Sequence, residues 1–76
     1  MNDVLNVWTV YAKGLETLPE EHICRRHEVN NGGSRPTADI IHSADLEQIR
    51  YTLRNWGLIC FQRDPDDDPV IIESWL

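Results

Sequence analysis

The sequence has few basic residues, no long apolar run and no secretory signal pattern. Lys and Arg number 7 against 13 Asp and Glu, which gives a formal net charge of −6, and Lys13 is the only lysine. An acidic surface disfavours binding to nucleic-acid backbones and anionic membranes, whereas it permits binding to a basic protein surface. No stretch approaches the ~20 apolar residues of a membrane-spanning helix. We therefore expect a cytoplasmic protein that binds neither membranes nor, directly, nucleic acids.

Cysteine is scarce as well, because the chain contains only Cys24 and Cys60. Thiols of cytoplasmic proteins stay reduced, and a free cysteine within an apolar run packs as a small hydrophobic side chain. Both cysteines lie in such runs, so we expect two buried thiols rather than a disulfide.

The length and composition are typical of one small globular domain that covers residues 1–76. Of the 76 residues, 41% are hydrophobic and 26% are charged, which is ordinary for a folded protein. A chain this short buries only ~60% of the surface that it exposes when unfolded, so its core is expected to be thin.

Apolar and β-branched residues predict four strands, and turn residues separate them. The segment 30–36, with two glycines and a proline, is interpreted as a turn or flexible loop, and residues 39–42 as a short extended piece that leads into the helix. An acidic turn over residues 64–68 suits an antiparallel hairpin between the last two strands. The four predicted strands cover residues 7–11, 22–29, 58–61 and 69–75.

One helix is predicted over about residues 43–56. Ser43 is a suitable N-cap because its hydroxyl accepts from a free backbone amide, and Gly57 can adopt the left-handed conformation that ends a helix. Apolar residues at i, i+3 and i+7 form one stripe for packing: Leu46, Ile49 and Leu53.

The element order β-β-α-β-β predicts an α+β fold, with a mainly antiparallel four-stranded sheet and the helix on one face. Neighbouring strands lie ~4.8 Å apart, so four strands are wider than the ~10 Å that one helix covers. Both alternating faces of residues 58–61 are apolar. We therefore expect some apolar sheet surface to be covered by loops, a second copy or a partner.

The acidic turn imitates the start of a calcium-binding loop through Asp64, Asp66 and Asp68. Such a loop needs Gly at its sixth position and Glu at its twelfth, where this chain has Pro69 and Trp75. A solvated turn is the simpler interpretation. Recognition of a basic patch on another protein is the functional alternative, and its candidate residues are Asp64, Asp66, Asp67 and Asp68.

The remaining polar motifs predict no catalytic, metal or cofactor site. His22, Cys24 and His27 resemble a zinc cluster, but on a strand His27 points to the opposite face from the other two. No nucleophile signature or phosphate loop is present. Arg26 is expected to pair with nearby carboxylates, and it is retained as a candidate partner-binding residue.

Trp75 is expected in the core, with an interface anchor as the alternative, since large aromatic residues dominate contact energies. Because the sequence ends on Trp75 and Leu76, we also expect this end to be docked in the fold or in a partner.

Several of these segments resemble a family of short bacterial proteins with no assigned activity. The matching residues are the first strand Trp8–Tyr11, the pair Arg25–Arg26, Pro36–Thr37, and the turn and strand from Asp67 to Leu76. Residues 15–21 depart from that pattern, because they lack an aromatic residue. The resemblance implies a folded domain, and it implies no mechanism.

Three functional hypotheses follow. The first is a non-enzymatic protein-interaction module that associates with itself through a partly apolar sheet face. The second is an acidic inhibitor or nucleic-acid mimic of the phage anti-CRISPR type, which would bind a basic protein surface through the acidic turn. The third is a small enzyme with its site in a dimer cleft.

Overall fold

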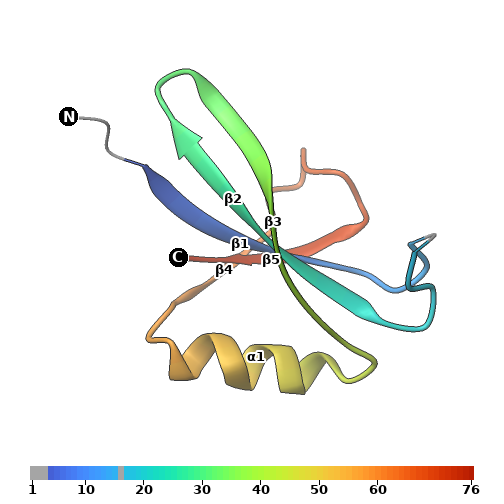
Figure 1. Ribbon diagram of the computed structural model, residues 1–76. Helices are drawn as coiled ribbons and strands as arrows, with labels where there is room; N and C mark the ends of the chain where they lie inside the picture. Colours follow the sequence, from blue (N-terminus) through green and yellow to red (C-terminus); the bar gives the residue numbers. More distant parts are fainter. Residues whose placement is uncertain (1–3, 16) are drawn as a thin grey trace.

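The computed structural model describes residues 4–15 and 17–76, which form a twisted antiparallel sheet with one helix against it (Figure 1). The strands follow the order β3-β2-β1-β5-β4 across the sheet, and each neighbouring pair is antiparallel. The elements along the chain are β1 (Leu5–Tyr11), β2 (His22–Asn30), β3 (Gly33–Ser43), α1 (Leu46–Asn55), β4 (Cys60–Gln62) and β5 (Ile71–Trp75).

The α+β class and the single helix on one face are confirmed, but the prediction of four strands in the order β-β-α-β-β was wrong, because three strands precede the helix and two follow it. The segment predicted as a loop and a short extended piece forms the 11-residue strand β3. Asn31 and Gly32 are the two-residue loop of a β2–β3 hairpin, and the Gly32 amide donates to the Asn30 side chain at 2.8 Å. Asn-Gly is common in such loops, but here neither residue has a positive φ, and Gly33, with φ of +122°, takes the left-handed conformation instead. Pro36 fits because β3 is an edge strand.

The helix is shorter at its start than the predicted residues 43–56. Ser43 is the last residue of β3, and Asp45 is the N-cap, where its carboxylate accepts from the Glu47 amide at 3.0 Å. The expected stop at Gly57 is present with φ of +81°. The amides of Gly57 and Leu58 donate to the carbonyls of Arg54 and Leu53, which is the hydrogen-bond pattern of a Schellman cap.

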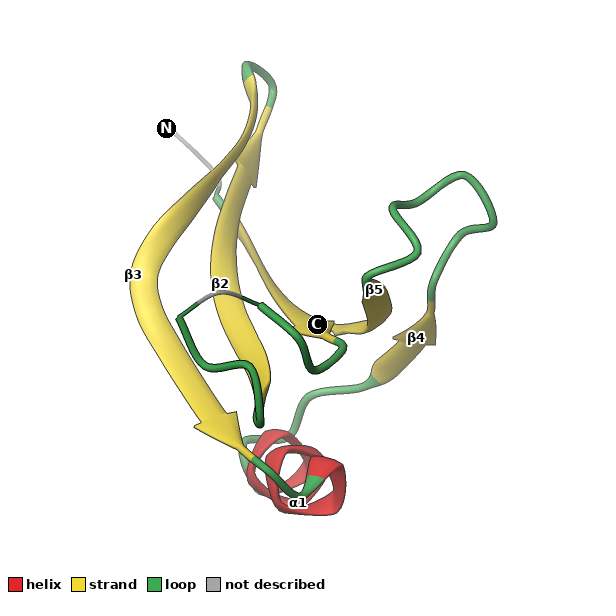
Figure 2. Ribbon diagram, turned by 90° about the vertical axis from the view of Figure 1, so that its right-hand side faces the viewer, coloured by secondary structure: helices red, strands yellow, loops and turns green. Residues whose placement is uncertain are grey.

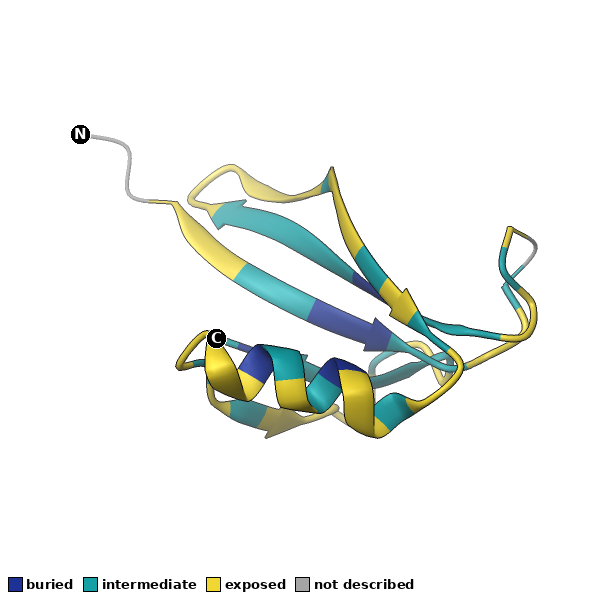
Figure 3. Ribbon diagram, turned by 60° about the horizontal axis from the view of Figure 1, so that its bottom comes forward, coloured by how far each residue is buried: buried dark blue, intermediate teal, exposed yellow. Residues whose placement is uncertain are grey.

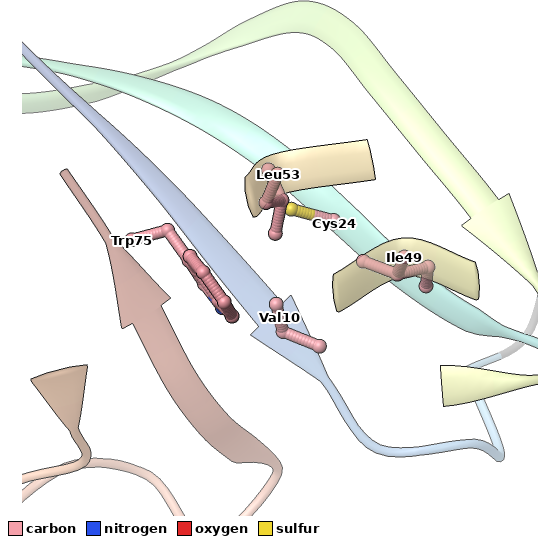
Figure 4. Close-up of a cluster of buried hydrophobic side chains, with 5 residues drawn as sticks. All are labelled: Val10, Cys24, Ile49, Leu53 and Trp75. Carbon is pink, nitrogen blue, oxygen red and sulfur yellow. The ribbon is translucent and has the colours of Figure 1, made fainter. Parts of the chain in front are cut away.

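The core lies between α1 and the middle of the sheet. Side chains from three strands and the helix meet there: Val10, Cys24, Ile49, Leu53 and Trp75 (Figure 4). Figure 3 shows that the outward turns of α1 and most of β3 are exposed, while the buried positions cluster where the helix faces the sheet. As the width of one helix predicts, much of the sheet has no helix over it.

On the helix side, the uncovered part of the sheet carries charged pairs rather than apolar residues. The β2–β3 hairpin extends beyond α1 (Figure 1). There the Arg26 guanidinium donates to Asp39 at 2.6 Å and to Asn6 at 2.9 Å, and it lies 3.6 Å from Glu28. The excess apolar surface must therefore be sought on the opposite face of the sheet.

Candidate interaction surface on the open face of the sheet

The face of the sheet opposite α1, which we call the open face, carries an exposed apolar patch. Cys60 pairs with Trp75 across β4 and β5, and both pack in the core on the helix side. Because side chains alternate along a strand, Ile59 and Phe61 point to the open face. The same alternation places Leu5 and Val7 of β1 there.

These residues form one continuous surface across three neighbouring strands. The Ile59 and Leu76 backbones exchange hydrogen bonds of 2.8 and 3.0 Å. Continuing the β1–β5 register from the Trp8–Trp75 pair places Leu76 beside Val7. We define the open-face patch as Leu5, Val7, Ile59, Phe61 and Leu76.

The patch is unusually exposed for residues of this kind. Ile59 is 65% exposed, Phe61 is 52% exposed and Leu5 is 50% exposed, whereas Val7 and Leu76 are half-buried. A single exposed apolar side chain is ordinary, but an adjoining set of them marks an interaction surface. The five side chains of the patch are all apolar, although Ser74, the pairing partner of Phe61, lies on the same face beside them.

The patch ends at a half-buried polar cluster on β1 and β2. The Tyr11 hydroxyl is 3.0 Å from Nε2 of His27, and the Arg25 guanidinium donates to the Thr37 carbonyl at 2.6 Å. Tyr11 pairs with Ile23, whereas His27 pairs with Val7, four residues earlier on β1. The Tyr11 ring must therefore lie across the buried Thr9 to reach His27. This part of the open face is therefore closed by its own side chains.

Burial shifts the pKa values of Tyr11 and His27 in this cluster. Desolvation raises the pKa of Tyr11, although the charge of Arg25 opposes the rise. Desolvation and the nearby Arg25 charge both lower the pKa of His27. His27 is therefore neutral at neutral pH, and its ring can share a hydrogen bond with the Tyr11 hydroxyl without introducing a second positive charge beside Arg25.

Strand β4 is an open edge of the sheet beside the patch. Ile59 bonds to Leu76, and Phe61 pairs with Ser74. Backbone groups alternate in direction along an antiparallel ladder, so the N–H and C=O groups of Cys60 and Gln62 point away from β5. An edge with free backbone groups and apolar side chains is a template for pairing with another strand.

The acidic turn between β4 and β5 uses most of its carboxylates to hold itself together. The carboxylates of Asp64, Asp67 and Asp68 accept from the amides of Asp66, Asp64 and Val70 at 2.9 to 3.1 Å. Among the contacts of the described residues, the Asp66 carboxylate accepts none. The turn projects away from α1 (Figure 2), which is consistent with the solvated interpretation. An acidic-inhibitor role would depend chiefly on Asp66.

The other two candidate partner-binding residues lie away from the open face. Trp75 is 2% exposed, and its indole N–H donates to Glu73 at 2.8 Å, so this residue belongs to the core. Arg26 lies on the helix side of the sheet and pairs with Asp39 and Glu28. The structure does not bring either residue together with the acidic turn or with the open-face patch.

A buried ion pair that the sequence analysis missed connects α1 to β5. Arg50 donates to both carboxylate oxygens of Glu73, at 2.8 and 3.1 Å, and it also pairs with Glu47 at 2.7 Å. Burial acts to raise the pKa of Glu73, but hydrogen bonds from Arg50 and Trp75 outweigh it and hold the pKa below the usual 4.5. The sequence feature that could have revealed this pair is Glu73, a charged residue within a mainly apolar strand.

The described residues contain no group of three or more metal-ligating side chains within reach of one ion. Nδ1 of His22 hydrogen-bonds the Tyr11 carbonyl, and His27 bonds the Tyr11 hydroxyl on the open face. Cys24 lies in the core, where burial, followed by the Glu73 charge, raises its pKa to about 12. The three residues of the zinc-like motif therefore have separate structural roles and do not form one site.

A shallow hollow lies between the end of β3 and α1. It is lined in part by His42, Ser43, Gln48 and Thr52. The Ser43 hydroxyl accepts from the Asp45 amide, the Thr52 hydroxyl donates to the Gln48 carbonyl, and Nδ1 of His42 lies 3.0 Å from the Glu21 carboxylate. These groups hold the local backbone and do not converge on one point.

In the described part of the chain, no helix has the length and apolar character needed to cross a membrane. Comparison with protein-family models, with curated proteins and with solved structures gives no match to this chain. The likeness to short bacterial proteins therefore stays a resemblance. The open-face patch is the feature of this molecule that suggests a function.

Proposed function

We propose that this protein is a small, non-enzymatic interaction module that associates with a second copy of itself through the open-face patch. The observation that supports the proposal is the exposure of Ile59, Phe61 and Leu5 on the one sheet face that α1 does not cover. Covering such a surface removes apolar area from water, which is the main favourable term in protein association.

The position of the patch favours a second copy as the occupant. The acidic turn projects away from the sheet and the helix lies on the other face, so neither covers the patch (Figure 2). The patch also adjoins the free edge of β4, which makes it part of the molecule's margin. A two-fold axis at a margin brings the same residues of both copies together, so one uncharged patch can complement itself.

The test is the oligomeric state measured by sedimentation over a concentration range up to about 1 mM, where even weak dimers form. We expect a concentration-dependent dimer that is lost in Ile59→Ser and Phe61→Ser. Both side chains are more than half exposed, so the fold should survive these substitutions, and far-UV circular dichroism checks this. A wild-type protein that stays monomeric throughout the range refutes the proposal.

Tyr51→Ser is the matched control. Tyr51 is 63% exposed, close to the value for Ile59, but it lies on α1 rather than on the open face. The dimer should persist in this variant. Loss of the dimer in Tyr51→Ser, with the dimer retained in Phe61→Ser, would place the interface on the helix and contradict the proposal.

A further inference from the structure

We infer that the two copies join by antiparallel pairing of their β4 strands, with a two-fold axis at Phe61. This inference rests on the proposed self-association and narrows the contact to the β4 margin of the open-face patch, where Phe61 and Ile59 meet across the axis. The rest of the patch is not covered in this arrangement. In this register Cys60 of one copy stands opposite Gln62 of the other, and the two Phe61 residues stand opposite each other. The result is one continuous sheet that extends through both copies.

The backbone of β4 allows only registers that differ by an even number of residues, and the axis at Phe61 is the one that pairs both outward residues within Cys60–Gln62. The N–H and C=O groups of Cys60 and Gln62 point outward, because those of Ile59 and Phe61 face β5. Pairing Cys60 with Gln62 of the second copy lets each such pair exchange both of its N–H···O=C bonds. A shift by one residue would instead aim the outward groups at residues whose own groups already bond β5.

The side chains fit the same register. Opposed residues of antiparallel strands lie on one face, so the two Phe61 rings meet on the open face. They do so at a position without backbone bonds between the two residues, where side chains approach most closely. Aromatic pairs at such positions contribute beyond their area alone. Each Ile59 lies diagonally beside the ring of the other copy and directly opposite its Arg63, whose side chain falls on the same face.

The other edge of the sheet is unsuited to this pairing. Strand β3 carries Pro36, and its register with β2 shifts between Arg25 and His27, which marks a bulge. Thr37 within this bulge donates its hydroxyl to the Arg26 carbonyl at 2.8 Å. Proline, bulges, charged side chains and short length are devices by which proteins protect edge strands, and β4 has only the last of these within Cys60–Gln62.

Charge also complements across the axis. The register places Asp64, the first residue of the acidic turn, opposite Leu58 of the second copy. Leu58 follows directly on the C-terminal cap of α1, where Arg54 is the basic residue of the last turn. The register therefore places each acidic turn toward the C-terminal end of the other copy's helix, where Arg54 lies over its own Trp75 ring, 5.8 Å from the ring centre. The positive charge at that end offsets part of the repulsion between two chains of net charge −6.

Amide hydrogen exchange measured by NMR at low and high protein concentration tests the pairing directly. In the monomer the amides of Cys60 and Gln62 face solvent, whereas those of Ile59 and Phe61 are held by β5. We expect protection of the Cys60 and Gln62 amides to rise with concentration in step with the dimer, by tenfold or more once the dimer dominates.

A pair of variants separates the backbone contact from the side chain. Gln62→Pro removes the outward N–H, which the monomer does not use, so the fold should be retained while the dimer dissociation constant rises about tenfold or more. Gln62→Ala keeps the N–H and should leave dimerisation nearly unchanged. Circular dichroism of both variants controls for folding.

The outcomes distinguish the two proposals. A wild-type dimer whose Cys60 and Gln62 amides stay unprotected, and which tolerates Gln62→Pro, packs face to face; this result overturns the strand pairing and leaves the proposed function standing. Equal loss of dimer in Gln62→Ala and Gln62→Pro also overturns the pairing, since it assigns the effect to the side chain. A monomer at every concentration overturns both.

Discussion

Arg50 of α1 donates two hydrogen bonds to the carboxylate of Glu73 on β5, from Nη2 at 2.8 Å and from Nε at 3.1 Å. The Glu73 side chain is only 3% exposed, whereas that of Arg50 is 28% exposed. This fork-to-carboxylate geometry fixes both the position and the rotation of the helix on the sheet. The pair lies on the same face of the sheet as the hydrophobic core, so it adds a polar link where α1 packs.

Replacing Arg50 should therefore destabilise the protein strongly. Arg50→Met leaves the buried Glu73 carboxylate without its cation, and we expect a loss of about 2–3 kcal/mol. This is below the ~3–5 kcal/mol typical of fully buried pairs, because water reaches the guanidinium. Chemical denaturation measures the change. Glu47→Gln removes the exposed partner of the same arginine, so it should cost less than about 0.5 kcal/mol.

Acid should weaken the fold through Glu73. Its pKa in the folded state lies below the ordinary 4.5, so the unfolded state binds the proton more readily. The stabilisation is therefore complete above about pH 4.5, and it is lost as the pH falls through the lowered pKa of the folded state. Thermal unfolding between pH 7 and pH 3 should show a falling Tm that is flatter in Glu73→Gln.

Glu28 provides the control for this pH dependence. Hydrogen bonds and charge from Arg35, and secondarily Arg26, also lower its pKa, but this carboxylate pairs at the surface. Glu28→Gln should leave the acid transition nearly as steep as in the wild type. Equal flattening by both substitutions would contradict a special role for the buried pair.

The helix terminator should be sensitive to any side chain. Gly57 has φ of +81°, and an added Cβ would meet no atom within 4 Å, so the cost of Gly57→Ala comes from the backbone alone. We expect a loss of about 1 kcal/mol in denaturant unfolding. Gly57→Asn should cost less, since asparagine tolerates this conformation better. Equal stability of all three proteins would contradict the assigned cap.

Carboxylates of the acidic turn should differ in their effect on stability. Asp68→Ala removes the acceptor of the Val70 amide and should cost about 0.5–1 kcal/mol. Asp66→Ala removes a carboxylate that caps no amide among the described contacts, and it should be neutral or slightly stabilising because it lowers repulsion in the turn. Urea unfolding of the two variants compares them, and the reverse order would refute the hydrogen bonding described for the turn.

The two thiols should react at different rates. Burial, followed by the Glu73 charge, raises the pKa of both cysteines, but Cys24 is fully buried and Cys60 is only half-buried. A thiol reagent near pH 8 should label Cys60 slowly and Cys24 only after unfolding, and the Cys60 rate should rise with pH. Native Cys60→Ser should show no labelling. Labelling of both thiols at one rate would contradict these burial states.

The helix and most strand positions could be predicted because their signals are local. The apolar stripe of α1 and the stop at Gly57 depend on neighbours within one or two turns. The start was misplaced because Ser43 and Asp45 are both good caps, and the choice between them depends on where β3 ends. Strand β3 was missed because Gly33 and Pro36 are loop residues in isolation. They are acceptable in a strand only once the Asn31–Gly32 hairpin places it at the sheet edge.

The candidate interaction surface could likewise be predicted only in part from the sequence. The sequence already indicated that residues 58–61 are apolar on both faces and that one helix is too narrow for the sheet. It could not indicate which residues stay exposed, because that depends on Cys60 pairing with the buried Trp75. This pairing turned Trp75 inward and left Ile59 and Phe61 as the exposed aliphatic and aromatic groups of the edge.

By itself, the sequence determined the α+β class, the amphipathic helix, the acidic hairpin turn and an excess of apolar strand surface, because each follows from composition and short-range periodicity. Only the tertiary structure decided the five-strand order, the buried Arg50–Glu73 pair and the face on which the apolar excess lies. These features join residues far apart in the chain, and their register is set by backbone pairing and packing that no local pattern records.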